Sequence, residues 1–120
     1  MRQIKKVQKH GLKFDSRLEL FFYELLVDAK IPFEFQVCYE MVPSFKYDGK
    51  AVRPMTLTVD FDFTDHGKNV IVDTKGFWRN DNKLKWKYFQ WGMSDVQPKL
   101  FFPKSQKECR DVIEIIKKIK

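Results

Sequence analysis

The spacing of hydrophobic residues divides the chain into short helices and strands. Over residues 16–29, apolar side chains recur every three or four positions behind a capping-box pattern, in which Ser16 is followed three positions later by Glu19. Residues 33–42 alternate between apolar and polar side chains, as strands do. The pattern therefore predicts a helix over 16–29, a strand over 33–42 with its apolar residues on one face, and then a long loop or hairpin excursion over 43–56.

Two further alternating runs follow, separated by a glycine turn. Residues 57–63 and 70–75 both alternate with period two, on either side of His66-Gly67, and this predicts an antiparallel hairpin. If His66-Gly67 is a two-residue loop, the numbers of paired residues sum to 133. That register places Asp60 directly opposite Asp73, on the face away from the apolar side chains.

The last third of the chain predicts two more helices and a strand. One helix begins at residue 81 or 82 and ends at Gly92, a short strand lies between the prolines at 98 and 103, and a second capping box opens a helix over 105–120. The order helix, strand, strand, strand, helix, strand, helix predicts an α/β fold with a mixed sheet flanked by helices. We expect one domain over residues 14–120, preceded by a basic N-terminal arm over residues 1–13.

Charge is distributed unevenly along the 120 residues. The net charge of +7 divides into +5 over residues 1–13, −4 over residues 14–75 and +6 over residues 76–120. Basic ends favour contacts with phosphates, whereas the acidic centre requires another explanation. Cys38 and Cys109 are too few for a disulfide framework, and no apolar run approaches the roughly 20 residues that span a bilayer. The composition excludes an ordinary secreted, membrane or fibrous protein, so we expect an intracellular one.

The facing aspartates are the feature of the predicted hairpin that demands a chemical reason. Like charges directly opposite each other destabilise an antiparallel pair, unless one carboxylate takes up a proton or a cation lies between them. Mg²⁺ prefers carboxylates, water and phosphate oxygens. Period two places Lys75 on the same face as Asp73, where the amine can orient a water or offset charge in a transition state. Glu19, one helix away, is a candidate third carboxylate.

These residues resemble the motif of the PD-(D/E)xK nuclease superfamily. The likeness rests on F-x-S-x-L-E at residues 14–19, on Asp60-Phe61, on V-D-T-K-G-F-W-R-N-D at residues 72–81, and on the element order αβββαβ. The chain is more similar still to the phage endonuclease I type of Holliday junction resolvases and to related phage nucleases. The resemblance implies a restriction-endonuclease-like fold and a Mg²⁺-dependent, structure-selective DNA endonuclease that resolves Holliday junctions or other branched DNA, with Mn²⁺ able to replace Mg²⁺.

The resemblance also implies roles for individual residues. Glu19, Asp60 and Asp73 would be metal-binding carboxylates, and Lys75 would be the catalytic lysine. The chain departs from the superfamily pattern at two positions. Val59 precedes Asp60 where proline is frequent, and Asp73 stands where glutamate is commoner, which shortens the reach to a metal but keeps the chemistry.

Basic and amide side chains outside the motif are candidates for contacts with the DNA backbone. They follow the motif or lie in the basic arm: Arg79, Asn80, Asn82, Lys83, Lys87, Lys5, Lys6, Lys9 and Lys13. A four-way junction has pseudo-twofold symmetry and needs paired cuts, so we expect a homodimer. The strand at 33–42 and the helix at 105–120 are the candidate dimer contacts, and the cytoplasm of a bacterial or phage-infected cell is the expected location.

Simpler interpretations remain open. Glu19 needs only to bond back to the Ser16 amide, as in any capping box. Asp60 and Asp62 suit the solvent-exposed face of an amphipathic hairpin, and Asp62 would replace Asp60 as a ligand if the register differs. For function, the alternatives are a nuclease acting on nicked, single-stranded or duplex DNA and a catalytically inactive nucleic-acid-binding module of the same fold.

Overall fold

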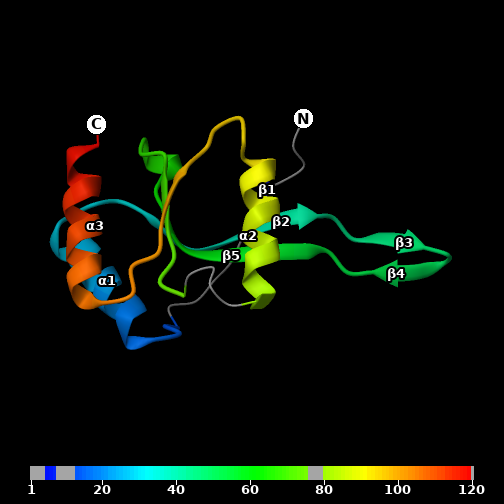
Figure 1. Cartoon of the computed structure of the whole chain (residues 1–120), viewed down its shortest axis with the longest axis horizontal. Helices are drawn as coiled ribbons and strands as arrows, with labels where there is room; N and C mark the ends of the chain where they lie inside the picture. The colour runs from blue at the N-terminus through cyan, green and yellow to red at the C-terminus, as the bar shows by residue number, and fades with distance from the viewer. Residues whose placement is uncertain (1–4, 8–12, 76–79, 120) are drawn as a thin grey trace.

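A five-stranded sheet with strand order β1-β2-β5-β6-β7 forms the centre of the structure, which is a computed structural model (Figure 1). The structure describes residues 5–7, 13–75 and 80–119, and only the backbone of residues 5, 7 and 80–82. Neighbouring strands are antiparallel except for β6 and β7, which are parallel. In chain order the elements are β1 (Lys5–Val7), α1 (Arg17–Asp28), β2 (Glu34–Val42), β3 (Phe45–Tyr47), β4 (Lys50–Val52), β5 (Met55–Asp62), the 3₁₀ turn η1 (Thr64–His66), β6 (Val70–Val72), α2 (Asn80–Gly92), β7 (Lys99–Phe101) and α3 (Gln106–Lys118).

Helices cover both faces of this sheet. Helices α1 and α3 pack against each other and bury one apolar cluster, to which β6 contributes Val70 and Val72. Helix α2 covers a second cluster, to which β6 contributes Ile71. Because successive side chains of a strand point to opposite faces, the two clusters lie on opposite sides of the sheet. The predicted α/β fold, with αβββαβ order and an additional C-terminal helix, is confirmed; β1 and the β3–β4 hairpin are additions to it.

The register predicted for the hairpin of β5 and β6 is correct, but its turn is not. Phe61 pairs with Val72 and Asp62 with Ile71, so the residue numbers sum to 133 as expected. The two-residue loop is wrong: the 3₁₀ turn and a left-handed Gly67 connect the strands. Strand β6 also ends at Val72, so the paired ladder stops before it reaches residues 60 and 73.

Strands β2 and β5 exchange faces halfway along their length. Phe33 and Phe35 pack with the α1–α3 cluster, whereas Tyr39 and Met41 belong to the α2 cluster. The prediction that the apolar residues of 33–42 share one face is therefore wrong. The physical cause lies at Gln36, whose φ of 53° is outside the extended region and interrupts the alternation. Strand β5 changes face at the same level, since its Leu57 and Val59 join the α2 cluster and its Phe61 and Phe63 the other.

Part of the predicted N-terminal arm belongs to the sheet. Strand β1 pairs with β2, with Lys6 opposite Tyr39, so residues 5–7 are not a free arm. Strand β2 therefore lies between β1 and β5, and β1 covers its outer edge at residues 38–40. Of the helices described, none is both long and apolar enough to cross a membrane.

Candidate metal centre

Three segments meet at one end of helix α1 and bring acidic side chains together. Asp15 precedes the N-cap of α1, Glu19 lies in the first turn of α1, and Asp60 lies near the C-terminal end of β5. One carboxylate oxygen from each of these three residues lies within 4.8 Å of the others. Lys75, in the bend after β6, adds an ammonium group to the same place. This group of four is the candidate metal centre.

Glu19 takes part in the N-terminal cap of α1, but the cap occupies only one of its two carboxylate oxygens. Its backbone N–H donates to Ser16 Oγ at 3.1 Å, as the capping box predicts. Its Oε1 atom accepts the backbone N–H of Asp15, however, and not that of Ser16. The side chain is fully buried, and among the described residues its Oε2 is the one buried side-chain polar atom without a hydrogen-bond partner. Unsatisfied buried oxygens are rare and call for an explanation.

Asp60 is buried completely and fixed by the bend that follows β6. Its Oδ2 accepts the backbone N–H of Thr74 at 2.8 Å and the Thr74 hydroxyl at 2.7 Å. Its Oδ1 lies 3.0 Å from Lys75 Nζ. Because every one of these donors comes from the segment after β6, folding of that bend sets the position of the carboxylate.

Lys75 bridges two of the three acids. Its Nζ lies 2.9 Å from Asp15 Oδ2 as well as 3.0 Å from Asp60 Oδ1. Burial would lower the pKa of Lys75, but the charge of Asp60 and the hydrogen bonds to Asp15 and Asp60 outweigh it, and the pKa lies above its ordinary value. The lysine is therefore a permanent cation at neutral pH.

Even with this cation nearby, the ionised form of Glu19 is disfavoured. Burial, then the nearby charge of Asp60 and the hydrogen bond that a protonated Glu19 makes to Asp60, raise the pKa of Glu19 from 4.5 to about 7. A carboxyl with such a pKa takes up a proton at mildly acidic pH, or gains a cation that replaces the proton. The donor set fits a hard divalent cation, since it consists of carboxylate oxygens, one of which has no other partner.

Asp73 is placed differently from the prediction. It is buried, its backbone N–H donates to Phe101 O, and its Oδ1 accepts the backbone N–H of Lys75 at 2.9 Å. Asp73 thus stabilises the bend that presents Lys75, and it is not one of the three grouped carboxylates. The expectation that Asp60 and Asp73 are paired across two strands is wrong, because β6 ends one residue before Asp73. Its charge still contributes to the raised pKa of Lys75.

Asp15 is the residue that the sequence reasoning missed. Within F-x-S-x-L-E it occupies a variable position, directly before the N-cap Ser16. Its place in the site depends on its own N–H bonding to Glu19 and on Lys75 reaching it from 60 residues away in the sequence. The signal available in the sequence was an acid next to a capping box, which many helices have for purely local reasons.

Asp62 is surrounded by donors and is not a substitute ligand. Its Oδ1 accepts the backbone N–H and the hydroxyl of Thr64 at 2.8 and 2.6 Å. Its Oδ2 accepts the hydroxyl of Tyr39 and lies 3.3 Å from Lys6 Nζ. Burial, and then the hydrogen bond to Asp62, raise the pKa of Tyr39 above its ordinary value, so the phenol remains a donor. The expectation that Asp60 and Asp62 form an exposed face is wrong, since both are fully buried.

The predicted DNA-contacting residues divide into three groups. Lys6 is half-buried, and its Nζ contacts the protein's own Asp62, Thr64 and Asp65. The side chains of Lys13, Lys83 and Lys87 are exposed to solvent. The remaining ones lie outside the described side chains: Lys5, Lys9, Arg79, Asn80 and Asn82.

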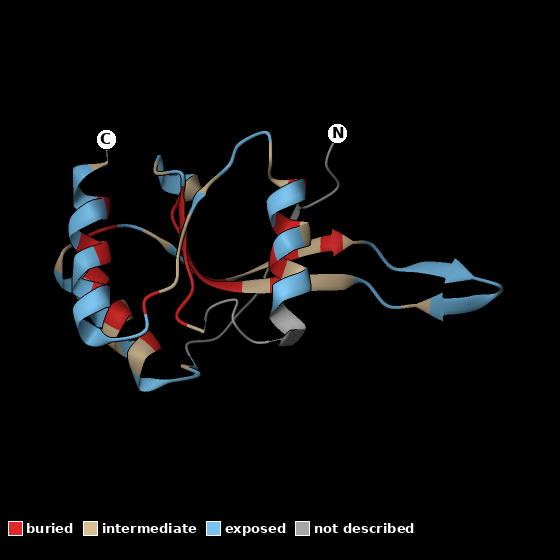
Figure 2. Ribbon diagram, viewed as in Figure 1, coloured by how far each residue is buried: buried red, intermediate tan, exposed pale blue. Residues whose placement is uncertain are grey.

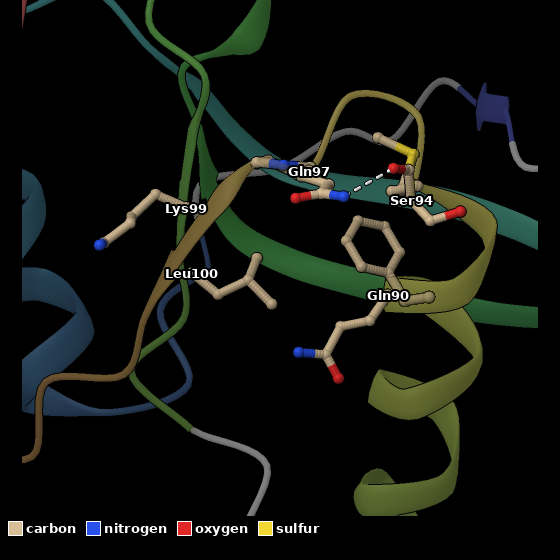
Figure 3. A pocket seen from close by; sticks show the side chains of 8 residues that line it. Gln90, Ser94, Gln97, Lys99 and Leu100 are labelled. Atoms are coloured by element: carbon tan, nitrogen blue, oxygen red, sulfur yellow. Dashed lines mark hydrogen bonds between the residues drawn. The ribbon is translucent and has the colours of Figure 1, made fainter.

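A hollow between α2 and β7 is separate from the carboxylate group. It has a volume of about 450 Å³ and is lined by Phe89, Met93 and Leu100 together with amide and hydroxyl side chains. Figure 3 shows Gln97 above the hollow, donating to the backbone of Ser94 at 3.0 Å. None of its lining residues is acidic, so it offers no carboxylate to bind a metal ion.

The fold and the site together define an α/β protein with a buried acidic group beside a lysine. A family model matches residues 2–109, and its description is "Protein of unknown function (DUF1064)". The chain belongs to this family. No curated protein and no solved structure matches the chain.

Proposed function

We propose that the protein is a Mg²⁺-dependent DNA endonuclease. The observation that carries the proposal is the unpartnered, buried Oε2 of Glu19 beside the Asp60 carboxylate and the Lys75 ammonium. A buried group of this kind is expected at a site that is completed by a ligand. The resemblance to PD-(D/E)xK nucleases, drawn on residues 14–19, 60–61 and 72–81, supports the same assignment.

The charges favour a divalent cation. Asp15, Glu19 and Asp60 carry up to three negative charges, and Lys75 supplies one positive charge. Mg²⁺ binds through a few carboxylates and keeps waters for the rest of its octahedron, and Mn²⁺ accepts the same ligands. Glu19 and Asp60 would hold the ion, with Asp15 at the more exposed side of the group. A bound Mg²⁺ would supply a Lewis acid for a phosphate oxygen and a more acidic water.

The protein's own residues would do the remaining work. Lys75, freed from Asp15 when DNA enters, offers an ammonium for a phosphate oxygen or for the attacking water. Asp60 keeps this lysine charged and in place through the 3.0 Å contact. Asp73 acts indirectly, since its side chain holds the backbone of Lys75 in the bend. The reaction is hydrolysis of a phosphodiester by water, with no covalent intermediate on the protein.

DNA, and branched DNA in particular, is the proposed substrate. The net charge of +7, with +6 over residues 76–120, favours a polyanion. The resemblance to junction-resolving phage enzymes supports a four-way junction or other branched DNA, a homodimer, and action in the cytoplasm of a bacterial or phage-infected cell. Nicked, single-stranded and duplex DNA are the competing substrates.

A catalytically inactive nucleic-acid-binding module is the second candidate. It is favoured by the two contacts of Lys75 with Asp15 and Asp60, because an ammonium in that position partly neutralises the acids without any metal.

Cleavage assays separate these candidates. The protein is incubated with four-way junction, nicked, duplex and single-stranded DNA, in Mg²⁺ or in a chelator. We expect symmetric cuts at the junction in Mg²⁺ alone and at least a 100-fold loss of rate for Asp60→Asn, with DNA binding retained. Asp95→Asn, on an exposed residue, is the matched control and should cleave normally.

Two results of this assay would contradict the proposal. DNA that is bound but never cut in Mg²⁺ would favour the inactive module. Full activity of Asp60→Asn would place the reaction elsewhere in the molecule.

A further inference from the structure

The β3–β4 hairpin is an arm that extends away from the rest of the molecule, as Figure 1 shows. Residues 43–54, here called the arm, join β2 to β5, and all of them except Val52 are exposed (Figure 2). The molecule measures 51 Å along the axis of the arm against 29 and 25 Å across it. A two-stranded ribbon has little stability of its own in water, so a ribbon that extends into solvent suggests a partner.

The arm is shaped by a tight turn at its tip. Asp48 and Gly49 have φ values of 52° and 74°, which are the left-handed angles that a two-residue hairpin turn requires. Glycine adopts this conformation without steric cost. The turn pairs Tyr47 with Lys50 and Phe45 with Val52. Paired residues share a face of the ribbon, so two aromatic rings and a cation lie on one face.

The charge and the aromatic rings of the arm fit a nucleic acid. The arm carries Lys46, Lys50 and Arg53 against a single acid, Asp48. Tyr47 is 73% exposed and Phe45 is 46% exposed. Cations that follow a backbone, interleaved with aromatic rings that stack on bases, are the combination found where proteins bind DNA grooves and unpaired bases. A second arm from another copy of the chain, with the same three cations and one acid, would bring like charges together instead.

The tip of the arm lies within one turn of duplex DNA of the carboxylate site. Gly49 at the tip is eleven residues from Asp60, and strands β4 and β5 connect the two. At about 3.3 Å per residue in a strand, the distance between them is at most about 36 Å. One turn of B-DNA is about 34–36 Å long. A ribbon of two strands also fits the width of the major groove.

We propose that the arm inserts into a groove of DNA up to one helical turn from the carboxylate site, with Lys46, Lys50 and Arg53 on phosphates and Tyr47 against bases. This inference rests on the proposed function for its substrate, but it concerns binding and not the chemical step. The arm would then contact the DNA on one side of the cut, at a fixed distance from it. Branched DNA has unstacked bases, which an aromatic ring at the tip of the arm can contact.

The test compares two variants of equal charge in a chelator, where no cleavage occurs. The arm variant is Lys46→Ser/Lys50→Ser/Arg53→Ser, and the control is Lys107→Ser/Lys117→Ser/Lys118→Ser on the exposed face of α3. The probes are a labelled four-way junction and a 30-base-pair duplex. We expect the arm variant to bind both about 10- to 100-fold more weakly than the wild type at about 0.15 M salt. The slope of the logarithm of its binding constant against the logarithm of salt concentration should be smaller in magnitude by about two to three. The control should stay within about threefold of the wild type. Tyr47→Ser should weaken junction binding about tenfold with the salt slope unchanged.

Each outcome decides the matter. Equal DNA affinity of the arm variant and the control overturns the inference. If sedimentation shows that the arm variant loses self-association while it binds DNA like the control, the arm contacts a second copy and the inference is wrong. If the wild type binds DNA through the arm but never cuts it in Mg²⁺, the proposed nuclease activity fails and the inference on the arm stands.

Discussion

Asp60 and Asp62 lie two residues apart on β5, and both are fully buried near a lysine, yet their surroundings differ. Asp62 receives bonds from a phenol, a hydroxyl, a backbone N–H and an ammonium. Asp60 also receives a hydroxyl and a backbone N–H, both from Thr74, and an ammonium from Lys75. It shares that lysine with Asp15, however, and lies beside Glu19, which keeps an oxygen without a partner. The difference between the two groups is therefore the neighbouring acids around Asp60, whose oxygens outnumber the available donors, and not the burial of the aspartate.

The largest effect on stability is expected from a substitution of Asp62. Asp62→Ala should destabilise the protein by about 3–5 kcal/mol, because it leaves the buried hydroxyl of Tyr39 and the backbone N–H of Thr64 without their acceptor and removes one of the two acids beside Lys6. Urea unfolding in a chelator measures this loss. Asp65→Asn, at an acid that is mostly exposed and also contacts Lys6, is the matched control and should cost less than about 1 kcal/mol. A loss below about 1 kcal/mol for Asp62→Ala would show that its hydrogen bonds are not what stabilises this region.

Glu19 should behave in the opposite way, with an effect that depends on pH. Its pKa is raised by burial and by Asp60 from 4.5 to about 7, so the folded protein keeps a proton that the unfolded chain releases. Raising the pH from about 4.5 through 7 therefore favours unfolding, and the cost levels off above pH 7. Glu19→Gln removes this cost and should be more stable than the wild type at pH 8, by up to about 3 kcal/mol, and not at pH 4.

The measurement is urea unfolding of both proteins in a chelator across this pH range. Only the difference between the two proteins counts, since other acids titrate in both. A constant difference from pH 4 to pH 8 would mean that the Glu19 carboxyl is not perturbed in the folded state.

Local sequence signals predicted the elements of this fold well, because local physics determines them. The capping boxes at Ser16 and Ser105 place the starts of α1 and α3, where each serine accepts a backbone N–H three residues on. The hairpin register follows from matching apolar faces, and it is correct at Phe61 and Asp62. Period two could not reveal where the alternation fails, since that depends on the single positive φ of Gln36.

The site was predicted only in part for a related reason. Glu19, Asp60 and Lys75 were predicted, and the structure brings them together. The role of Asp73 was drawn from an ideal strand, but the chain bends after Val72 and the Asp73 side chain bonds to the backbone of Lys75 instead. The Asp15 side chain joins the site through its contact with Lys75, which is far away in the sequence, and no local pattern encodes that contact.

Mg²⁺ binding measured by titration calorimetry at pH 7.5 tests the central assignment most directly. The wild type should bind the ion, and Glu19→Gln should bind it at least tenfold more weakly. Asp65→Asn should bind it like the wild type, since Asp65 contacts Lys6 beside Asp62 and is not one of the grouped carboxylates. Equal affinity of the wild type and Glu19→Gln, or no binding by the wild type, would contradict the view that the unpartnered Glu19 oxygen marks a metal centre.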